Sequence, residues 1–319
     1  MIEPEDNTIS DSSSDEIPND SSETESIAEV HEEASKEISI HGGEELDSIS
    51  ASEITSKYDT VIIVIAGPKG SGKTTLLASI YDSFHIGEFA NCTFAESRTL
   101  VAFEERSHLA RVESGIHAPT ATRTPLGAGV QFLHLCVRQN SLPNNSNLLF
   151  ADMSGEYYRM AKDSAEDCRE ISILTRADYI ALLIDCELLS SQTTRHLCLV
   201  DARQLLRRCI EEGMLKSHTN IHILYSKWDV VIKSNCEKEL EPVLKDFEQT
   251  IRTTVEDKIA DMEFFKVAAS PKQESSLGLG YGIDTIFEKW VKKKEKKIEL
   301  DISKGQKSAK REFDRFLSS

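Results

Sequence analysis

The stretch GPKGSGKT, from Gly67 to Thr74, contains residue types that could hold a phosphate group. It satisfies the pattern G-x-x-x-x-G-K-[ST], in which glycines let phosphate oxygens reach the backbone N–H groups of a turn. The stretch follows an apolar run that ends at Ala66 and precedes a helical sequence, which is the context that the motif requires. These features predict nucleotide binding. The alternative is a chance match in a solvated Gly/Ser turn.

Each part of this loop has an expected chemical role. The Lys73 ammonium group would reach the β- and γ-phosphates, and the Thr74 hydroxyl would bind Mg²⁺. The positive end of the following helix would favour the same anion. The residues expected to contact the phosphates are Gly67, Lys69, Gly70, Ser71, Gly72, Lys73, Thr74 and Thr75.

A second segment, NLLFADMSGE, ends an apolar run at Asp152 and continues to Gly155. A carboxylate at the carboxyl end of a strand can hold Mg²⁺ through water, and the Gly155 N–H can contact a γ-phosphate. Contacts of this kind order a loop that relaxes after hydrolysis. The alternative is an aspartate that ends a strand in an ordinary turn.

A third segment, Ser226-Lys227-Trp228-Asp229, follows another apolar run and indicates which base is bound. The Asp229 carboxylate can accept hydrogen bonds from the N1–H and the exocyclic amino group of guanine, a donor pair that adenine lacks. A buried acceptor discriminates strongly because the wrong base leaves it unpaired. The stem of Lys227 can lie along the base plane. These residues favour guanine, and the alternative is a surface turn.

Six strand-like runs position these segments. Several are almost continuously apolar, which is typical of strands covered on both faces. Helical stretches at 72–83, 192–213, 237–259 and 283–294 separate most of them, so the chain is predicted to be a doubly wound α/β domain with a mostly parallel six-stranded sheet. The second and third runs lack an intervening helix, so we expect an antiparallel hairpin there. The runs are 60–66, 130–137, 147–152, 179–185, 220–225 and 263–268.

Two further regions lie outside this alternation. The region 85–126 is unusually long, and the segment 97–115 within it is expected to form an inserted amphipathic helix. Residues 1–56 contain 17 Asp or Glu and one Lys, and so contribute −16 of the net charge of −17. Such a segment buries too little apolar surface to offset the entropy of ordering, so we expect a disordered tail. The nucleotide-binding domain would then span 57–299, followed by a charged tail at 300–319.

The remaining composition limits the class of protein. There is no signal-peptide pattern and no run of about 18 apolar residues that could span a membrane. The seven cysteines form no CxxC pair, which favours reduced core thiols over disulfides or zinc. We expect a cytoplasmic protein, and the nearly neutral globular part gives no reason to expect nucleic-acid binding.

The motifs occur in the order of the TRAFAC-class GTPases, which the chain resembles over residues 58–290: GPKGSGKTT, DMSGE, SKWD and a final turn, VAAS. The segments SRTLVAFEERSHLARVESG and TATRTPLG also resemble the bacterial double-GTPase families of conflict and defence gene clusters. The resemblance implies GTP and GDP as ligands, with Mg²⁺. It places Lys73, Thr74 and Asp152 at the phosphates and the metal ion, and Lys227 and Asp229 at the base.

Two positions depart from the pattern of this class. Ser226 stands where Asn or Thr is usual, and it keeps a hydroxyl with less reach. The VAAS turn is an imperfect match to the motif that contacts the base last, and Ala269 is the residue expected to make that contact. Both departures concern the base rather than the phosphates.

The same resemblance identifies three catalytic or metal-binding candidates. Many of these enzymes place Gln after D-x-x-G to orient water. Here the residue is Glu156, whose carboxylate a γ-phosphate would repel, and which fits the first turn of a helix equally well. Thr124 is the expected second Mg²⁺ ligand, with Thr122 and Thr120 as alternatives. Arg123 could neutralise developing phosphate charge, or it could face solvent.

The sequence therefore predicts a Mg²⁺-dependent switch that hydrolyses GTP slowly to GDP and phosphate and is read by an unidentified protein partner. One alternative is a GTP-loaded scaffold with little turnover, which Glu156 suggests. Another is a P-loop ATPase or a small-molecule kinase, although the sequence has no Arg-rich lid segment.

Overall fold

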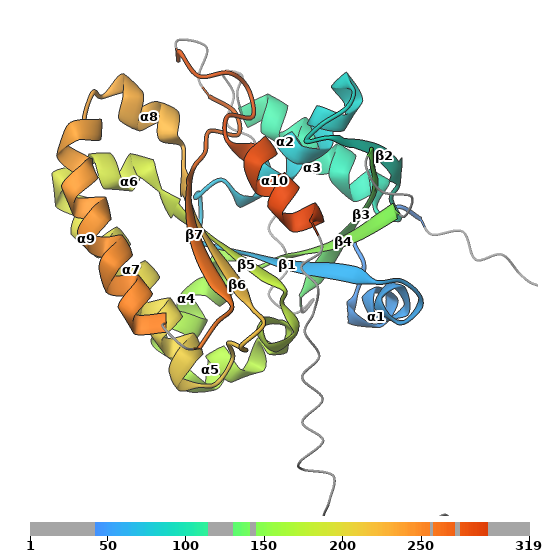
Figure 1. Ribbon diagram of the computed structural model, residues 1–319, viewed down its shortest axis with the longest axis horizontal. Coiled ribbons are helices and arrows are strands. Elements are labelled where there is room, and N and C mark those ends of the chain that lie inside the picture. Colours follow the sequence, from blue (N-terminus) through green and yellow to red (C-terminus); the bar gives the residue numbers. More distant parts are fainter. Residues whose placement is uncertain (1–41, 114–129, 141–144, 256–257, 272–274, 293–319) are drawn as a thin grey trace, which may run out of the picture. The chain divides into compact units, whose positions relative to one another are not determined.

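A seven-stranded sheet with helices on both faces forms the domain (Figure 1). The computed structural model describes residues 42–113, 130–140, 145–255, 258–271 and 275–292. The strand order is β2-β3-β4-β1-β5-β6-β7. The predicted doubly wound, mostly parallel α/β fold is confirmed, but the sheet has seven strands where six were expected.

The strands are short and the helices separate most of them. The strands are β1 (Thr60–Ala66), β2 (Cys92–Glu96), β3 (Gln131–Gln139), β4 (Asn145–Asp152), β5 (Tyr179–Asp185), β6 (Asn220–Ser226) and β7 (Asp261–Lys266). The helices are α1 (Ser48–Lys57), α2 (Lys73–Ile86), α3 (Leu100–Glu113), α4 (Gly155–Asp163), α5 (Ala165–Glu170), α6 (Cys186–Ser190), α7 (Gln192–Glu211), α8 (Trp228–Lys233), α9 (Glu237–Val255) and α10 (Ile283–Val291), with a 3₁₀ turn at Ser172–Arg176.

The centre of the sheet is parallel. Strand β1 pairs in parallel with β4 on one side and with β5 on the other, and β6 and β7 continue in the same direction. Strands β5 and β6 are buried along their whole length, because helices cover both faces of the sheet. The loops that follow β1, β4, β5, β6 and β7 therefore lie together at the carboxyl ends of these strands. This end of the sheet is called the loop edge below.

The other end of the sheet is antiparallel. Strands β3 and β4 form the expected hairpin, and β2 adds antiparallel to β3 at the sheet edge. Strand β2 was missed in the sequence because only Cys92 of its five residues is fully buried, so it lacks an apolar alternation. The inserted helix that was expected in this region is α3.

Each face of the sheet has its own helical layer. Helices α2, α3 and α10 pack on the face that carries Ile63 and Ile65 of β1, while α1 and α4–α9 pack on the face that carries Val64 and Ala66. Figure 1 shows α2, α3 and α10 grouped on one side of the sheet. Two separate apolar cores therefore hold β1 from opposite sides.

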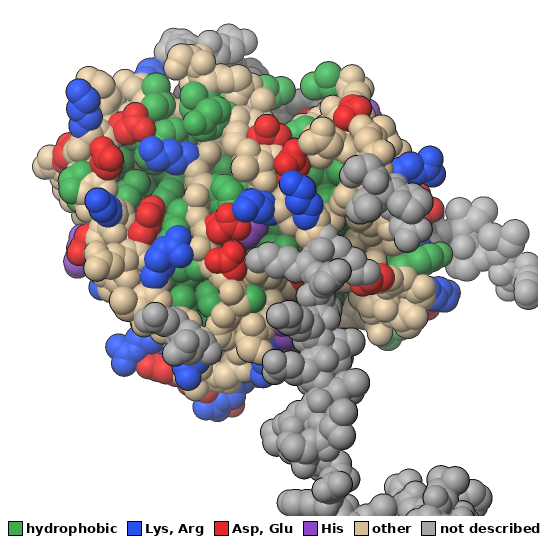
Figure 2. Space-filling view, viewed as in Figure 1, with side chains coloured by type: hydrophobic (Ala, Val, Ile, Leu, Met, Phe, Trp, Pro, Cys, Tyr) green, Lys and Arg blue, Asp and Glu red, His purple; other side chains and the backbone are tan. Residues whose placement is uncertain are grey.

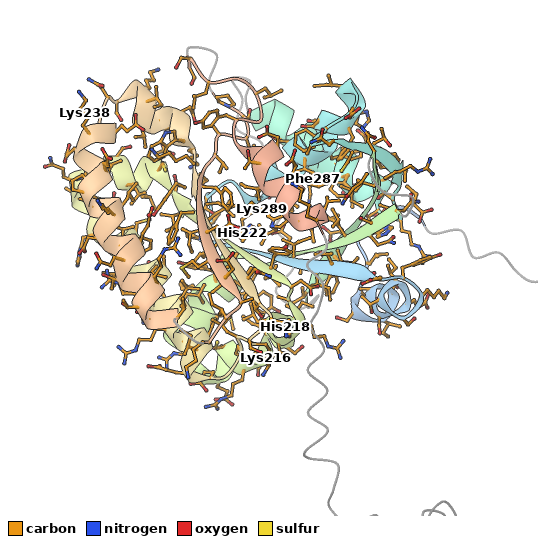
Figure 3. All side chains as sticks on the ribbon, in the orientation of Figure 1. Lys216, His218, His222, Lys238, Phe287 and Lys289 are labelled. Atoms are coloured by element: carbon orange, nitrogen blue, oxygen red, sulfur yellow. The ribbon has the colours of Figure 1, made fainter. Side chains whose placement is uncertain are left out.

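Helix α10 is anchored to β6 and β7. The Trp290 indole donates to Nδ1 of buried His222 at 3.2 Å, and Lys289 pairs with Glu263 of β7 at 2.7 Å. Figure 3 shows His222 beside the helix that carries Phe287 and Lys289. Helix α10 therefore closes the face on which α2 lies.

Residues 42–56, assigned from composition to a disordered tail, belong to the domain instead. The Asp47 carboxylate accepts from the Ser50 N–H at 2.8 Å and caps α1, and Ile54 of that helix is fully buried. Leu46 pairs with Phe132 of β3 through two backbone hydrogen bonds of 2.9 Å. Because acidic residues dominate the composition of residues 1–56, that composition gives no sign of the few apolar residues, such as Leu46 and Ile54, that this segment buries. Residues 1–41 and 300–319, the rest of the expected tails, lie outside the described residues.

Two other expectations concerned disulfide bonds and membrane-spanning segments. All seven cysteines are free thiols, and six of them are buried. Within the ranges that the structure describes, no helix combines the length and the apolar character that crossing a membrane requires.

Helix α1 provides a test of the revised domain boundary. We expect Ile54→Ala to lower the free energy of unfolding by about 2–4 kcal/mol, because it leaves a cavity against the sheet. Ile49→Ala, in the same helix but 74% exposed, should change it by less than about 0.5 kcal/mol. Urea unfolding followed by circular dichroism measures both, and equal midpoints for the two variants would place α1 outside the cooperative domain.

Candidate functional site

The glycine-rich loop joins β1 to α2, and glycine is needed in it for two different structural reasons. A Cβ atom on Gly67 would lie 2.7 Å from the Ser71 hydroxyl and 3.0 Å from the Leu183 carbonyl oxygen, so β5 packs too closely for a side chain. Gly70 and Gly72 have φ angles of +82° and +91°, which favour glycine. A Cβ atom on either would meet nothing within 4 Å, so open space lies beside both.

Lys73 begins α2 and lies at the centre of this loop. Its Nζ atom donates to the carbonyl oxygens of Gly67 at 2.9 Å and Pro68 at 3.0 Å, and the residue is only 8% exposed. Burial lowers the pKa of Lys73 below its usual range, and the Asp152 carboxylate opposes that shift. The loop therefore carries a buried cation that is held by its own backbone.

The start of α2 is suited to an anion. Gly72 is the N-cap and makes no side-chain capping hydrogen bond, so the partial positive charge of the helix end is not balanced by a cap. Thr74 is exposed and Thr75 is half-buried, while Lys69 is exposed at the tip of the loop. The buried Ser71 hydroxyl has no hydrogen-bond partner in the part of the chain that the structure describes.

Asp152 ends β4 directly beside β1, where it pairs in register with Ile65. Its side chain is 13% exposed, and its Oδ1 atom has no hydrogen-bond partner among the described residues. Burial raises the pKa of Asp152, and the charges of Arg106 and Lys73 oppose that shift. A nearly buried carboxylate oxygen without a partner is suited to a cation or to its water shell.

Gly155 and Glu156 follow at the start of α4. The Ser154 hydroxyl caps this helix by accepting from the Tyr157 N–H at 3.2 Å. A Cβ atom on Gly155 would lie 2.5 Å from the backbone nitrogen of Lys69, so this segment packs backbone to backbone on the glycine-rich loop. Glu156 is half-buried in the first turn of α4, where the helix dipole favours an acid.

The Ser226–Asp229 segment follows β6. Lys227 adopts a left-handed conformation with φ of +56°, and its Nζ atom donates to Asp185 at 2.8 Å and Glu187 at 3.0 Å. Trp228 is buried, and its backbone N–H donates to the Val267 carbonyl at 3.0 Å. The backbone next to Asp229, which is 7% exposed, is therefore fixed to the chain that follows β7, and the Lys227 side chain is fixed to Asp185 at the end of β5.

Three further hydrogen bonds tie the Ser226–Asp229 segment and the turn that contains Ala269 to neighbouring elements. The Ser226 hydroxyl donates to the Ile184 carbonyl of β5 at 3.1 Å. The Ala269 carbonyl accepts from the Ser79 hydroxyl of α2 and from the Gly280 N–H, both at 3.1 Å. The turn after β7 is thus joined to the helix that starts at Lys73.

The structure places most of the predicted residues in the loops at the carboxyl ends of the parallel strands. Arg123, Thr124 and the alternatives Thr120 and Thr122 lie in the segment 114–129, outside the described residues. Within the described chain, no group of three or more His, Cys, Asp or Glu side chains could hold a metal ion alone. A cation at Asp152 would therefore depend on ligands from Thr74 and a bound phosphate.

Sequence reasoning missed three residues of this site. Asp185 could have been found, because an aspartate that ends an apolar strand is the same signal that identified Asp152. Glu187 follows it by two residues and joins it in binding Lys227. Arg106 carried no signal, since an arginine on an amphipathic helix normally faces solvent, whereas this one is 9% exposed.

A separate groove runs along β7. Figure 2 shows hydrophobic side chains gathered on the face that carries this strand, with acidic and basic side chains around them. The groove has a volume of about 910 Å³, and its aromatic lining residues are Phe89, Tyr225, Phe264, Phe265 and Tyr281. None of the residues predicted to contact nucleotide lines it, so the loop edge remains the candidate site.

The comparison that decides the family is a match over residues 61–291 to the model of a family described as Double-GTPase 2. This match covers more than half of the chain and includes every loop of the candidate site. The chain belongs to the Double-GTPase 2 family.

Solved structures that resemble this Double-GTPase 2 protein are distant. The Ski7 GTPase-like domain of S. cerevisiae, bound to GTP, has a TM-score of 0.44 and 16% identity, over 76% of this chain and 52% of that one. The SRb-GTP/SRX signal recognition particle receptor complex of Chaetomium thermophilum has a TM-score of 0.39 and 14% identity, over 73% and 96%. The match thus spans about half of the Ski7 chain. No curated protein has a sequence that matches this one.

The close approach of Gly155 to the glycine-rich loop of this Double-GTPase 2 protein can be tested. We expect Gly155→Ala to lower the free energy of unfolding by about 1–3 kcal/mol, because its Cβ atom would displace the Lys69 backbone. Gly278→Ala is the matched control, since a Cβ atom there would meet nothing within 4 Å. Urea unfolding measures both variants, and equal stabilities would contradict the packing described.

Proposed function

We propose that this protein binds GTP with Mg²⁺ and hydrolyses it to GDP and phosphate. The observation that carries the proposal is the placement of Lys73 and Asp229 after β1 and β6, whose carboxyl ends lie on the same side of one mostly parallel sheet, in a chain of the Double-GTPase 2 family. The phosphate end of the ligand would lie at Lys73 and its base at Asp229.

The triphosphate would be bound mainly by backbone and by Lys73. The open side of Gly70 and Gly72 leaves room for phosphate oxygens, and the uncapped start of α2 supplies N–H donors. The Lys73 ammonium group, which now donates to two carbonyl oxygens of the same loop, would donate to β- and γ-phosphate oxygens instead. Burial strengthens this contact because little water competes for the charge.

Thr74 and Asp152 fit a Mg²⁺ ion bound to the same phosphates. Thr74 offers an exposed hydroxyl, and Asp152 offers a carboxylate oxygen with no partner in the described chain. We assign the second direct ligand to Thr124, with Thr122 or Thr120 as the alternatives, while Asp152 would act through water. Thr74 and Asp152 would hold the ion beside the phosphates, and its charge would neutralise part of theirs.

The guanine base would be recognised by Asp229. Its carboxylate would accept from the N1–H and the amino group of guanine, and the shielded position of the residue makes an unpaired acceptor costly with adenine. The stem of Lys227, held by Asp185 and Glu187, would lie against the base plane. Ser226 and the Ala269 backbone would complete the pocket.

Hydrolysis would be slow, and Glu156 is the reason. Its carboxylate stands where an uncharged amide usually orients water, and it would be repelled by the γ-phosphate. We assign Arg123 to the opposing role of neutralising charge as the phosphate leaves. Loss of the γ-phosphate would release the Gly155 N–H and relax the surrounding loops, and a protein partner would read that change.

The cellular role that we propose follows from the likeness to bacterial double-GTPase families of conflict and defence gene clusters. In that setting the protein would act in the cytoplasm as a switch within a multi-protein response. Its ligand would be GTP, with no nucleic acid required.

Asp229 provides the decisive test of base choice. We expect Asp229→Asn to weaken GTP binding by about a hundredfold or more and to abolish the preference over ATP, because the paired acceptor is lost. Asp246→Asn, an exposed acid on α9, is the matched control. Competition of GTP and ATP against a fluorescent guanine nucleotide measures the preference. If ATP competes as well as GTP against the unchanged protein, the proposal is wrong.

Glu156 separates a slow enzyme from a GTP-loaded scaffold. We expect Glu156→Gln to raise the single-turnover rate of phosphate release by about tenfold, because the amide removes the charge repulsion without changing shape. Glu166→Gln, an exposed acid on α5, should leave the rate unchanged. If neither the unchanged protein nor Glu156→Gln releases phosphate from bound GTP, the scaffold function is favoured instead.

A further inference from the structure

Arg106 of α3 joins the start of the domain to the proposed metal site, and the inference drawn from it rests on the function proposed above. The guanidinium group hydrogen-bonds Glu45, and the same Nη2 atom lies 3.9 Å from Oδ2 of Asp152. Its Nη1 atom donates to the Ala102 carbonyl at 3.1 Å. One nearly buried cation is therefore shared by two carboxylates.

Helix α3 holds Arg106 in this place. Tyr81 of α2 donates to Glu104 at 2.8 Å, and its ring stacks on Phe103 with a centroid separation of 5.0 Å. The neighbouring Ser107 hydroxyl donates to Asp82 of α2. Because α3 is fixed to the helix that begins at Lys73, the position of Arg106 is tied to the position of the glycine-rich loop.

Glu45 is held just as firmly, from two sides. The Ala102 N–H donates to the Gly43 carbonyl at 3.0 Å, which fastens the chain to the first turn of α3. On the other side, the two hydrogen bonds between Leu46 and Phe132 fasten it to β3. Glu45 thus faces Arg106 because backbone bonds on both sides of it leave it little freedom.

Arg106 does not bind the carboxylates of Glu45 and Asp152 equally. Glu45 receives a direct hydrogen bond from Arg106, whereas the separation of 3.9 Å from Asp152 is that of an ion pair without a hydrogen bond. The Oδ1 atom of Asp152 and the Nε atom of Arg106 both lack a partner among the described residues. Asp152 is therefore a nearly buried anion that the described chain neutralises only in part.

We propose that Glu45 restrains Arg106 and thereby keeps Asp152 free to hold the water shell of Mg²⁺. Without Glu45, the guanidinium group would be free to pair with Asp152 through two hydrogen bonds, the strongest geometry for this type of pair. That pair would compete with the metal ion. Glu45 is thus a positioning residue that acts on Mg²⁺ affinity through Arg106.

The test measures Mg²⁺ affinity rather than turnover. The rate at which a fluorescent GDP analogue dissociates is recorded against Mg²⁺ concentration, which gives the concentration for half-maximal retention. We expect Glu45→Gln to raise that concentration about tenfold, within the range typical of coupled sites. Glu44→Gln, the exposed neighbouring acid, is the matched control and should not change it.

A double variant identifies Arg106 as the agent. In an Arg106→Gln background no guanidinium group can compete, so adding Glu45→Gln should change the half-maximal Mg²⁺ concentration by less than about twofold. Urea unfolding of each variant accompanies the measurement. A purely structural role would lower stability without moving the Mg²⁺ midpoint of Glu45→Gln, and that result would overturn the inference.

The failure of the inference is distinguishable from that of the proposed function. If the unchanged protein retains the GDP analogue in a Mg²⁺-dependent way but Glu45→Gln behaves like Glu44→Gln, the inference alone is wrong. A shift of equal size in the Arg106→Gln background also overturns it. If the unchanged protein shows no Mg²⁺-dependent retention, the proposed function is wrong and the inference is lost with it.

Discussion

The parallel pairing of β1 with β4 and β5 is the constraint on which the rest of the structure depends. It delivers the glycine-rich loop, Asp152 and Asp185 to one edge of the sheet, and β6 adds the segment that contains Asp229. Gly67 shows how closely these strands pack, since β5 lies too near to admit a side chain there. Two apolar cores, one on each face, hold β1 in place and so hold the loop that follows it.

The parts of this arrangement that depend on local residue type could be predicted from the sequence. Strand β5 was identified with its observed bounds because six apolar residues, Tyr179 to Ile184, run without interruption up to Asp185. The glycine-rich loop, Asp152 and the Ser226–Asp229 segment each follow such a run, so their shared edge follows from a parallel sheet. The hairpin of β3 and β4 was predicted because no helical sequence separates the two runs.

The parts that depend on distant contacts could not be predicted. Helix α1 lies in an acidic segment, and its few apolar residues acquire meaning only when β3 and the sheet are present to cover them. Arg106 is buried because Glu45, some sixty positions earlier, balances its charge. Neither Arg106 nor Glu45 belongs to a recognisable sequence pattern, since a single charged residue is ordinarily solvated.

The bridge between Leu46 and Phe132 has a consequence for the edge of the sheet. Strand β2 protects only the Cys136–Gln139 end of β3, and Leu46 occupies the other end of the same edge. A chain cut at the boundary that its composition suggests would bare that stretch of β3 together with the apolar surface beneath Ile54. Exposed strand edges are templates for pairing with other chains, and the short segment before α1 covers part of this one.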